Sequence, residues 1–160
     1  MTFFFDKEEE FFIQNNQVSQ VPKSKSIEIP DNSTIFYEVI RVINGIPLFL
    51  DEHVDRLEKS TLLSGIEIDL DQLVKNIIEL VKRNPVKEKN LKISLYCDQT
   101  DRQKHQIVAY FIESNYPLAR IYQNGVRAEL IPLKRNNPNV KLENPALRHS
   151  ADKVICLSQT

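Results

Sequence analysis

The sequence has few cysteines, almost no net charge and no long apolar run, and each shortage argues against a class of protein. Cys97 and Cys156 are far apart and have no second Cys or His at a metal-binding spacing, which argues against a disulfide framework and a structural zinc site. The formal charge of -1 argues against a generic binder of nucleic acid or anionic membranes. No apolar run reaches the length of a membrane span, and Phe3 to Phe5 is too short, with too acidic a flank, for a signal peptide. A cytoplasmic protein with one hydrophobic core is expected.

Strand and helix signals come in runs instead of strict alternation. β-branched and aromatic residues surround Asn44-Gly45, a dipeptide that readily takes the positive φ angles of a two-residue turn. In chain order the sequence predicts a strand over 11–13, a loop over 22–26, a hairpin over 35–50, a helix over 52–64 capped by Asp51 and ended by Gly65, a helix over 70–84 capped by Asp69, strands over 91–97 and 106–113, a strand over 126–133 after a turn at Asn124-Gly125, a loop over 134–139 and a helix over 146–157. This order predicts the α+β class, with a mainly antiparallel sheet and two packed helices.

Two adjacent segments and one distant lysine carry the candidate chemistry. Tyr37 opens the run Tyr-Glu-Val-Ile-Arg-Val-Ile-Asn-Gly, Arg56 lies in the run Glu-His-Val-Asp-Arg-Leu that follows, and Lys141 lies far downstream. Together they resemble the first domain of the class IV aminotransferases, the fold-type IV pyridoxal-phosphate enzymes. This family includes D-amino acid and branched-chain aminotransferases and 4-amino-4-deoxychorismate lyases. The resemblance implies pyridoxal 5'-phosphate as cofactor, an N-terminal domain over 1–135 and an interdomain segment over 136–160.

The resemblance also implies roles for individual residues. Lys141 matches the lysine that binds the cofactor covalently and moves the substrate proton. Arg56 matches the arginine that binds the cofactor phosphate, a task that suits the fixed fork of guanidinium donors. Tyr37 matches a tyrosine that faces the substrate pocket. Arg102 and His105 lie in the loop before a strand, where some D-amino acid aminotransferases hold a trap for the substrate carboxylate that serves the partner subunit.

Each of these side chains also has a purely structural interpretation. Arg56 could form a surface salt bridge with Asp55 or Glu52. Lys141 could be an ordinary solvated lysine, and Tyr37 could be an aromatic residue of the core or of a sheet face. Spacing in the sequence leaves both interpretations open.

The sequence departs from the family pattern before Tyr37, after Lys141 and at its end. Residues 31–36 replace a glycine-rich turn, and residues 142–145 differ from the segment that follows the lysine in many relatives. In relatives, a longer second half supplies a glutamate beside the cofactor ring nitrogen and the rest of the phosphate cup, so we expect the chain to carry the N-terminal half only.

Two functions of different classes follow from these observations. The first is an aminotransferase that moves an amino group from an amino acid to a 2-oxo acid, with 4-amino-4-deoxychorismate lyase as the alternative within the family. The second is a non-catalytic domain that keeps the fold for binding or assembly. In either case a homodimer is expected, because the family's pockets lie near a subunit interface.

Overall fold

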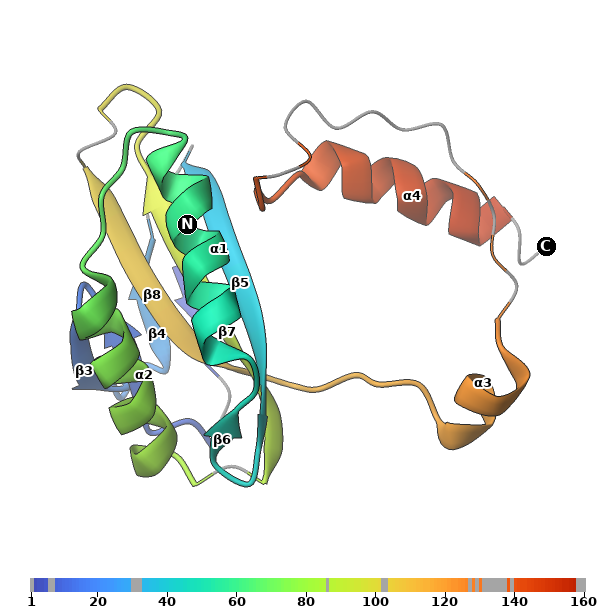
Figure 1. Cartoon of the computed structure of the whole chain (residues 1–160), viewed down its shortest axis with the longest axis horizontal. Helices are drawn as coiled ribbons and strands as arrows, with labels where there is room; N and C mark the ends of the chain where they lie inside the picture. The colour runs from blue at the N-terminus through green and yellow to red at the C-terminus, as the bar shows by residue number, and fades with distance from the viewer. Residues whose placement is uncertain are drawn as a thin grey trace.

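In a computed structural model of the chain, two helices lie on one face of a six-stranded antiparallel sheet (Figure 1). The structure describes residues 2–5, 8–29, 33–85, 87–101, 104–126, 128, 130, 138 and 140–157, with the backbone alone over 153–157. The strand order in the sheet is β3-β2-β8-β7-β5-β6, and β1 and β4 form a separate antiparallel pair. The strands are β1 Thr2–Phe4, β2 Phe11–Gln14, β3 Gln17–Gln20, β4 Ser26–Glu28, β5 Thr34–Ile43, β6 Ile46–Pro47, β7 Glu88–Cys97 and β8 His105–Ile112. The helices are α1 Leu50–Leu62, α2 Leu70–Arg83, α3 Ala119–Asn124 and α4 Pro145–Leu157. The predicted α+β class is confirmed.

The hairpin and the start of α1 show where local sequence signals succeed and where they fail. Asn44 and Gly45 have φ angles of 49° and 77°, so the predicted turn is confirmed. The helix begins at Leu50, earlier than predicted, and the returning strand is correspondingly short. Phe49 precedes the helix in a left-handed conformation and makes no side-chain cap bond. Asp51 is therefore not the cap; it lies in the first turn, where its charge favours the helix dipole.

A side chain at each end of helix α2 forms hydrogen bonds with backbone groups. The Asp69 side chain accepts a hydrogen bond of 3.0 Å from the N–H of Gln72, which confirms the predicted cap. At the other end, the Asn84 side chain accepts from the N–H groups of Glu10 and Phe11, at 3.2 Å each, and donates to the carbonyl of Phe11 at 2.9 Å. Asn84 thus ties the end of α2 to the start of β2.

The alternation of side chains along the strands divides the apolar residues between the two sheet faces. The face under α1 and α2 forms the main core, whose fully buried members include Ile40, Leu57, Leu73, Ile77, Leu91 and Ile93. The opposite face has a second cluster beneath β1 and β4, made of Phe5, Phe12, Ile29, Tyr96, Val108 and Tyr110. In β5 the even-numbered residues from Phe36 to Val42 are buried toward the helices, and the odd-numbered ones are partly exposed on the other face.

After β8 the chain leaves the sheet, passes through α3 and returns to the free edge of β5 before α4 (Figure 1). Phe36 and Leu142 form an isolated antiparallel bridge at this return point. The helix predicted over 146–157 is confirmed as α4. The strand predicted over 126–133 is wrong at its described positions 126, 128 and 130, because α3 comes just before them and they pair with nothing in a sheet. Its other positions, and most of the loop predicted over 134–139, lie outside the described residues.

Candidate functional site

A buried carboxylate, Glu38, lies at the centre of the candidate site. It is 0% exposed and points from β5 toward α1. Arg56 donates from Nε to Glu38 Oε1 at 2.7 Å and from a terminal nitrogen to Oε2. The Nδ1 atom of His53 lies 2.7 Å from Oε2, and the Nζ atom of Lys141 lies 3.4 Å from the same oxygen. One carboxylate therefore contacts a guanidinium, an imidazole and an amine.

These contacts keep Glu38 ionised although it is buried. Burial by itself raises the pKa of Glu38, but the hydrogen bonds from Arg56 and His53 and the positive charge of Lys141 outweigh it and hold the pKa below its usual value. The bond to Glu38 in turn raises the pKa of Arg56. An ionised carboxylate can only accept hydrogen bonds, so His53 donates from Nδ1 to Glu38. Its contact of 3.1 Å with Arg56 is then a close approach of two donors.

Lys141 is positioned by its backbone as well as by its side chain. The N–H of Tyr37 donates to the Lys141 carbonyl at 3.2 Å, and the N–H of Lys141 lies 3.5 Å from Oγ of Ser60. Ser60 itself donates to the carbonyl of Arg56 at 2.8 Å. The ammonium of Lys141 lies 5.0 Å from the centre of the Tyr37 ring, within the range of a cation–π contact. The structure therefore brings Lys141, Arg56 and Tyr37 together.

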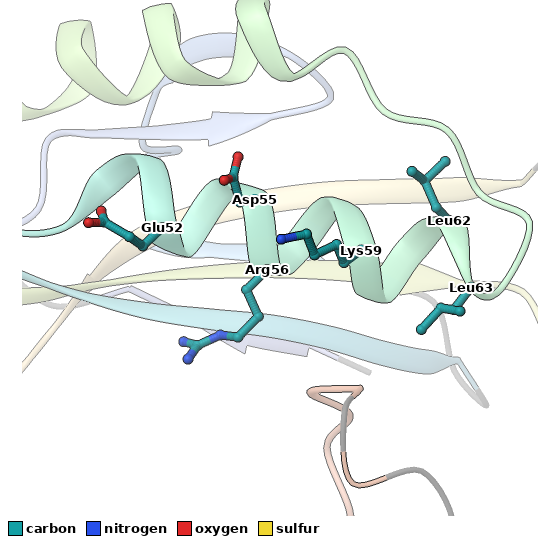
Figure 2. A pocket seen from close by; sticks show the side chains of 6 residues that line it. All are labelled: Glu52, Asp55, Arg56, Lys59, Leu62 and Leu63. Atoms are coloured by element: carbon teal, nitrogen blue, oxygen red, sulfur yellow. The ribbon is translucent and has the colours of Figure 1, made fainter.

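Helix α1 presents the polar part of the site on one side. His53, Arg56 and Ser60 are three and four residues apart, a spacing that places side chains on the same helix face. Arg56 projects from α1 toward β5, whereas Asp55 points away from it (Figure 2). The side chain of Arg56 is 49% exposed, and the bonds to Glu38 use Nε and one terminal nitrogen. Among the described residues no hydrogen bond uses the other terminal nitrogen, which leaves it available to an anion.

An open groove of about 800 Å³ runs along this helix. Its lining combines charged and apolar side chains: Glu52, Asp55, Arg56, Lys59, Leu62 and Leu63. Arg56 is the residue that belongs both to the groove and to the Glu38 cluster. Neither Asp55 nor Glu52 is its partner, so the salt bridges considered from the sequence are not the ones formed.

Of the other two predicted site residues, one cannot be placed and the other lies apart from this cluster. Arg102 lies outside the described residues. His105 begins β8, which is separated from β5 by β7, and lines a small hollow with Asn15, Asn16 and Ile107. Within the described structure, its Nδ1 is buried without a hydrogen-bond partner. His105 is therefore not placed beside Tyr37 within one chain, and its role in a trap that serves the partner subunit stays a prediction.

Sequence reasoning assigned no role to Glu38 or Ser60. A signal for Glu38 exists, because it alternates with Phe36 and Ile40 on the buried side of β5, where the other buried residues are apolar. A charged residue at such a position needs partners of opposite charge. Ser60 has no comparable signal, since its role depends on where the distant segment around Lys141 returns.

The described part of the chain has neither a membrane-spanning helix nor a group of metal ligands. None of the described helices is both long and apolar enough to cross a bilayer. No three His, Cys, Asp or Glu side chains with described positions gather as metal ligands would.

The fold is shared with solved structures at low sequence identity. Branched-chain amino acid aminotransferase from Escherichia coli superposes with a TM-score of 0.55 at 10% identity, over 66% of this chain and 41% of that one. 4-Amino-4-deoxychorismate lyase from Pseudomonas aeruginosa superposes with a TM-score of 0.56 at 15% identity, over 72% of this chain and 44% of that one. These similarities establish the fold.

Sequence comparison extends the similarity from fold to family. D-alanine aminotransferase from Bacillus licheniformis is 33% identical in an alignment of 117 residues, which covers 64% of this chain and 41% of that protein. The chain thus spans less than half the length of this relative. The family model described as "Amino-transferase class IV" matches residues 35–155. The chain belongs to the class IV aminotransferase family.

Proposed function

We propose that this chain contributes the amine and a phosphate anchor of the pyridoxal-phosphate site in an aminotransferase, which moves an amino group from an amino acid to a 2-oxo acid. The observation that carries the proposal is the shared contact of Lys141 and Arg56 with one buried carboxylate, Glu38. Because the chain spans less than half of its curated relative, the proposal concerns the roles of these residues in the whole protein.

The side chains present fit the chemical groups of this cofactor. An aldehyde requires a primary amine, and the Lys141 side chain that carries one is 30% exposed beside the groove helix. A phosphate requires fixed donors, and Arg56 keeps one terminal nitrogen free of Glu38. Glu38 would prevent the guanidinium from turning away, since it binds two of its nitrogens. Arg56 would add its positive charge on the side where the phosphate binds.

Each residue then has a definable task. When bound, pyridoxal phosphate supplies an electron sink for the negative charge that develops at the substrate α-carbon. Lys141 binds the cofactor covalently and, when released, takes and returns the proton at that carbon through Nζ. Arg56 orients the bound group through its phosphate, and the ring of Tyr37 forms a wall beside the Lys141 amine.

The curated relative favours amino transfer over lyase chemistry. D-alanine aminotransferase is 33% identical, whereas the structure of the lyase is similar in fold at 15% identity. The fold alone cannot favour either reaction, because the branched-chain aminotransferase and the lyase superpose almost equally well.

Covalent labelling tests the proposal. The chain is incubated with pyridoxal phosphate and treated with borohydride, and the labelled peptides are quantified by mass spectrometry. We expect Lys141 to be labelled faster than Lys134 and Lys153, which lie in the same region of the sequence. Lys92 is a matched control, because its ammonium also lies near the Tyr37 ring, at 5.6 Å from its centre, but is paired with Glu143. Labelling of Lys141 no faster than of Lys134 and Lys153 would contradict the proposal.

We further propose that the chain forms a homodimer. Phe49 and Leu63, at the two ends of α1, are 70% and 72% exposed, and such large apolar side chains favour association. Size-exclusion chromatography with light scattering tests this proposal. A sharp monomer peak that does not change with concentration would refute it.

A further inference from the structure

The segment that carries Lys141 is attached to the sheet by an ion pair that the proposed chemistry does not use. Nζ of Lys92, on β7, lies 2.5 Å from Oε1 of Glu143. The side chains are only 22% and 31% exposed, so the pair is largely shielded from solvent. Glu143 follows Lys141 by two residues and therefore shares its side of an extended segment.

The ion pair adds to two backbone hydrogen bonds along the free edge of β5. Tyr37 donates to the carbonyl of Lys141 at 3.2 Å, and Glu143 donates to the carbonyl of Ile35 at 2.9 Å. Leu142, between them, bridges to Phe36 and packs on the main core. The segment 141–143 thus lies on β5 as a very short edge strand, and Lys92 reaches Glu143 from β7, the strand on the other side of β5.

A short edge strand needs a feature that fixes its register. A slip by one residue breaks the bond from the Tyr37 N–H to the Lys141 carbonyl and moves every side chain to the opposite face. For this segment a slip would move Lys141 off the face that it shares with Tyr37 and so change the position from which its amine reaches Glu38. Leu142 on the core side and the Lys92–Glu143 pair on the other side both favour the observed register.

Glu38 and Glu143 each pair with a different lysine. The ammonium groups of Lys141 and Lys92 lie 5.0 Å and 5.6 Å from the centre of the same Tyr37 ring. Glu38 contacts the first and Glu143 the second. Each lysine therefore has its own counter-charge, which leaves Glu38 to hold Lys141.

We propose that Lys92 is a positioning residue for Lys141: by holding Glu143, it fixes the register of segment 141–143 on β5 and thereby the place of the amine beside Glu38. The functional significance of this proposal rests on the proposed role of Lys141. The claim about the register does not, because the register can be measured without cofactor.

Amide hydrogen exchange of Tyr37 in the 160-residue chain measures the register directly, since this N–H bonds to the Lys141 carbonyl. We expect Lys92→Met to accelerate exchange at Tyr37 two- to fivefold, equivalent to about 0.4–1 kcal/mol, with no comparable change in α2. Glu143→Gln should have the same effect, and the double variant should exchange no faster than either single variant. Lys89→Met is the matched control on the same strand, because Lys89 pairs with Glu8 and Glu113 instead.

The outcomes separate this inference from the proposed function. Equal acceleration at Tyr37 and throughout α2 would mean that Lys92 only stabilises the fold, and would overturn the inference. Unchanged exchange at Tyr37, or effects of the two single variants that multiply in the double variant, would overturn it as well. Borohydride labelling is then compared in the same variants: slower labelling of Lys141 in Lys92→Met supports the inference. If wild-type Lys141 is not labelled preferentially, the proposed function fails while the exchange data still decide the register.

Discussion

Replacing Glu38 tests whether one carboxylate organises the site. Glu38→Gln keeps the shape of the side chain but removes its charge, and one amide oxygen must replace two carboxylate oxygens. The wild-type carboxylate accepts two bonds from Arg56 and one from His53, and bonds to charged groups contribute about 1.5–3 kcal/mol each. Arg56 is half exposed and can bond to water in the variant. We therefore expect a loss of only about 1–2 kcal/mol in the free energy of unfolding.

Removing the arginine should cost more than removing the carboxylate. Arg56→Gln leaves Glu38 charged and 0% exposed, with His53 and Lys141 as its remaining partners. An uncompensated buried charge costs about 3–5 kcal/mol, and the remaining partners reduce this to about 2–4 kcal/mol.

Urea denaturation of both variants measures the difference. Glu88→Gln is the control, because Glu88 also binds an arginine, Arg41, but both side chains are exposed. We expect it to destabilise the chain much less than either site variant. If Glu38→Gln is neutral, or costs more than Arg56→Gln, the reasoning about the buried charge is refuted.

Three further predictions concern pH dependence and the scaffold. The folded-state pKa of Glu38 is below its ordinary value of 4.5, so its stabilising contribution is present above that value and is lost as pH falls through the lowered pKa. The stability difference between wild type and Glu38→Gln should therefore shrink as pH falls below 4.5, and parallel pH profiles would contradict the assignment. Asn84→Ala removes the acceptor of two backbone N–H groups and should cost about 2–4 kcal/mol in urea denaturation; a loss as small as that of an exposed substitution would exclude the tie between α2 and β2. Asp69→Ala should lower the free energy of unfolding by about 1 kcal/mol, because the cap is lost. Asp71→Ala is the control, since Asp71 lies in the first turn of α2 but is not the cap. If Asp69→Ala lowers the thermal midpoint no more than Asp71→Ala does, the cap assignment is contradicted.

The elements of the fold were predictable where strong local signals agree. The Asn44-Gly45 turn and the Asp69 cap follow from backbone preferences of those residue types, and both are confirmed. The start of α1 was not predictable in this way. Phe49 takes a left-handed conformation that its residue type does not favour, so the chain context and not a local preference decides where the helix begins.

The candidate site was only partly predictable, because its residues come from distant parts of the chain. The motifs identified Tyr37, Arg56 and Lys141, whose functional roles stay predictions. Their contact depends on the return of the chain to the edge of β5, which no local periodicity encodes. The role of Glu38 is predictable, because a carboxylate on the buried side of a strand needs charged partners. The pairing of Glu143 with Lys92 is not, because it depends on which strands are neighbours in the sheet.

The central claim is that Arg56 and Lys141 serve one cofactor site, Arg56 by binding its phosphate. The most direct measurement compares the rates at which pyridoxal phosphate and pyridoxal, which lacks the phosphate, label Lys141. We predict that wild type favours the phosphorylated aldehyde by about tenfold or more, since a charge-assisted anchor is worth about 1.5–3 kcal/mol. This preference should disappear in Arg56→Gln and persist in Lys59→Gln, which removes another cation from the same groove. An equal preference in wild type and Arg56→Gln would contradict the account.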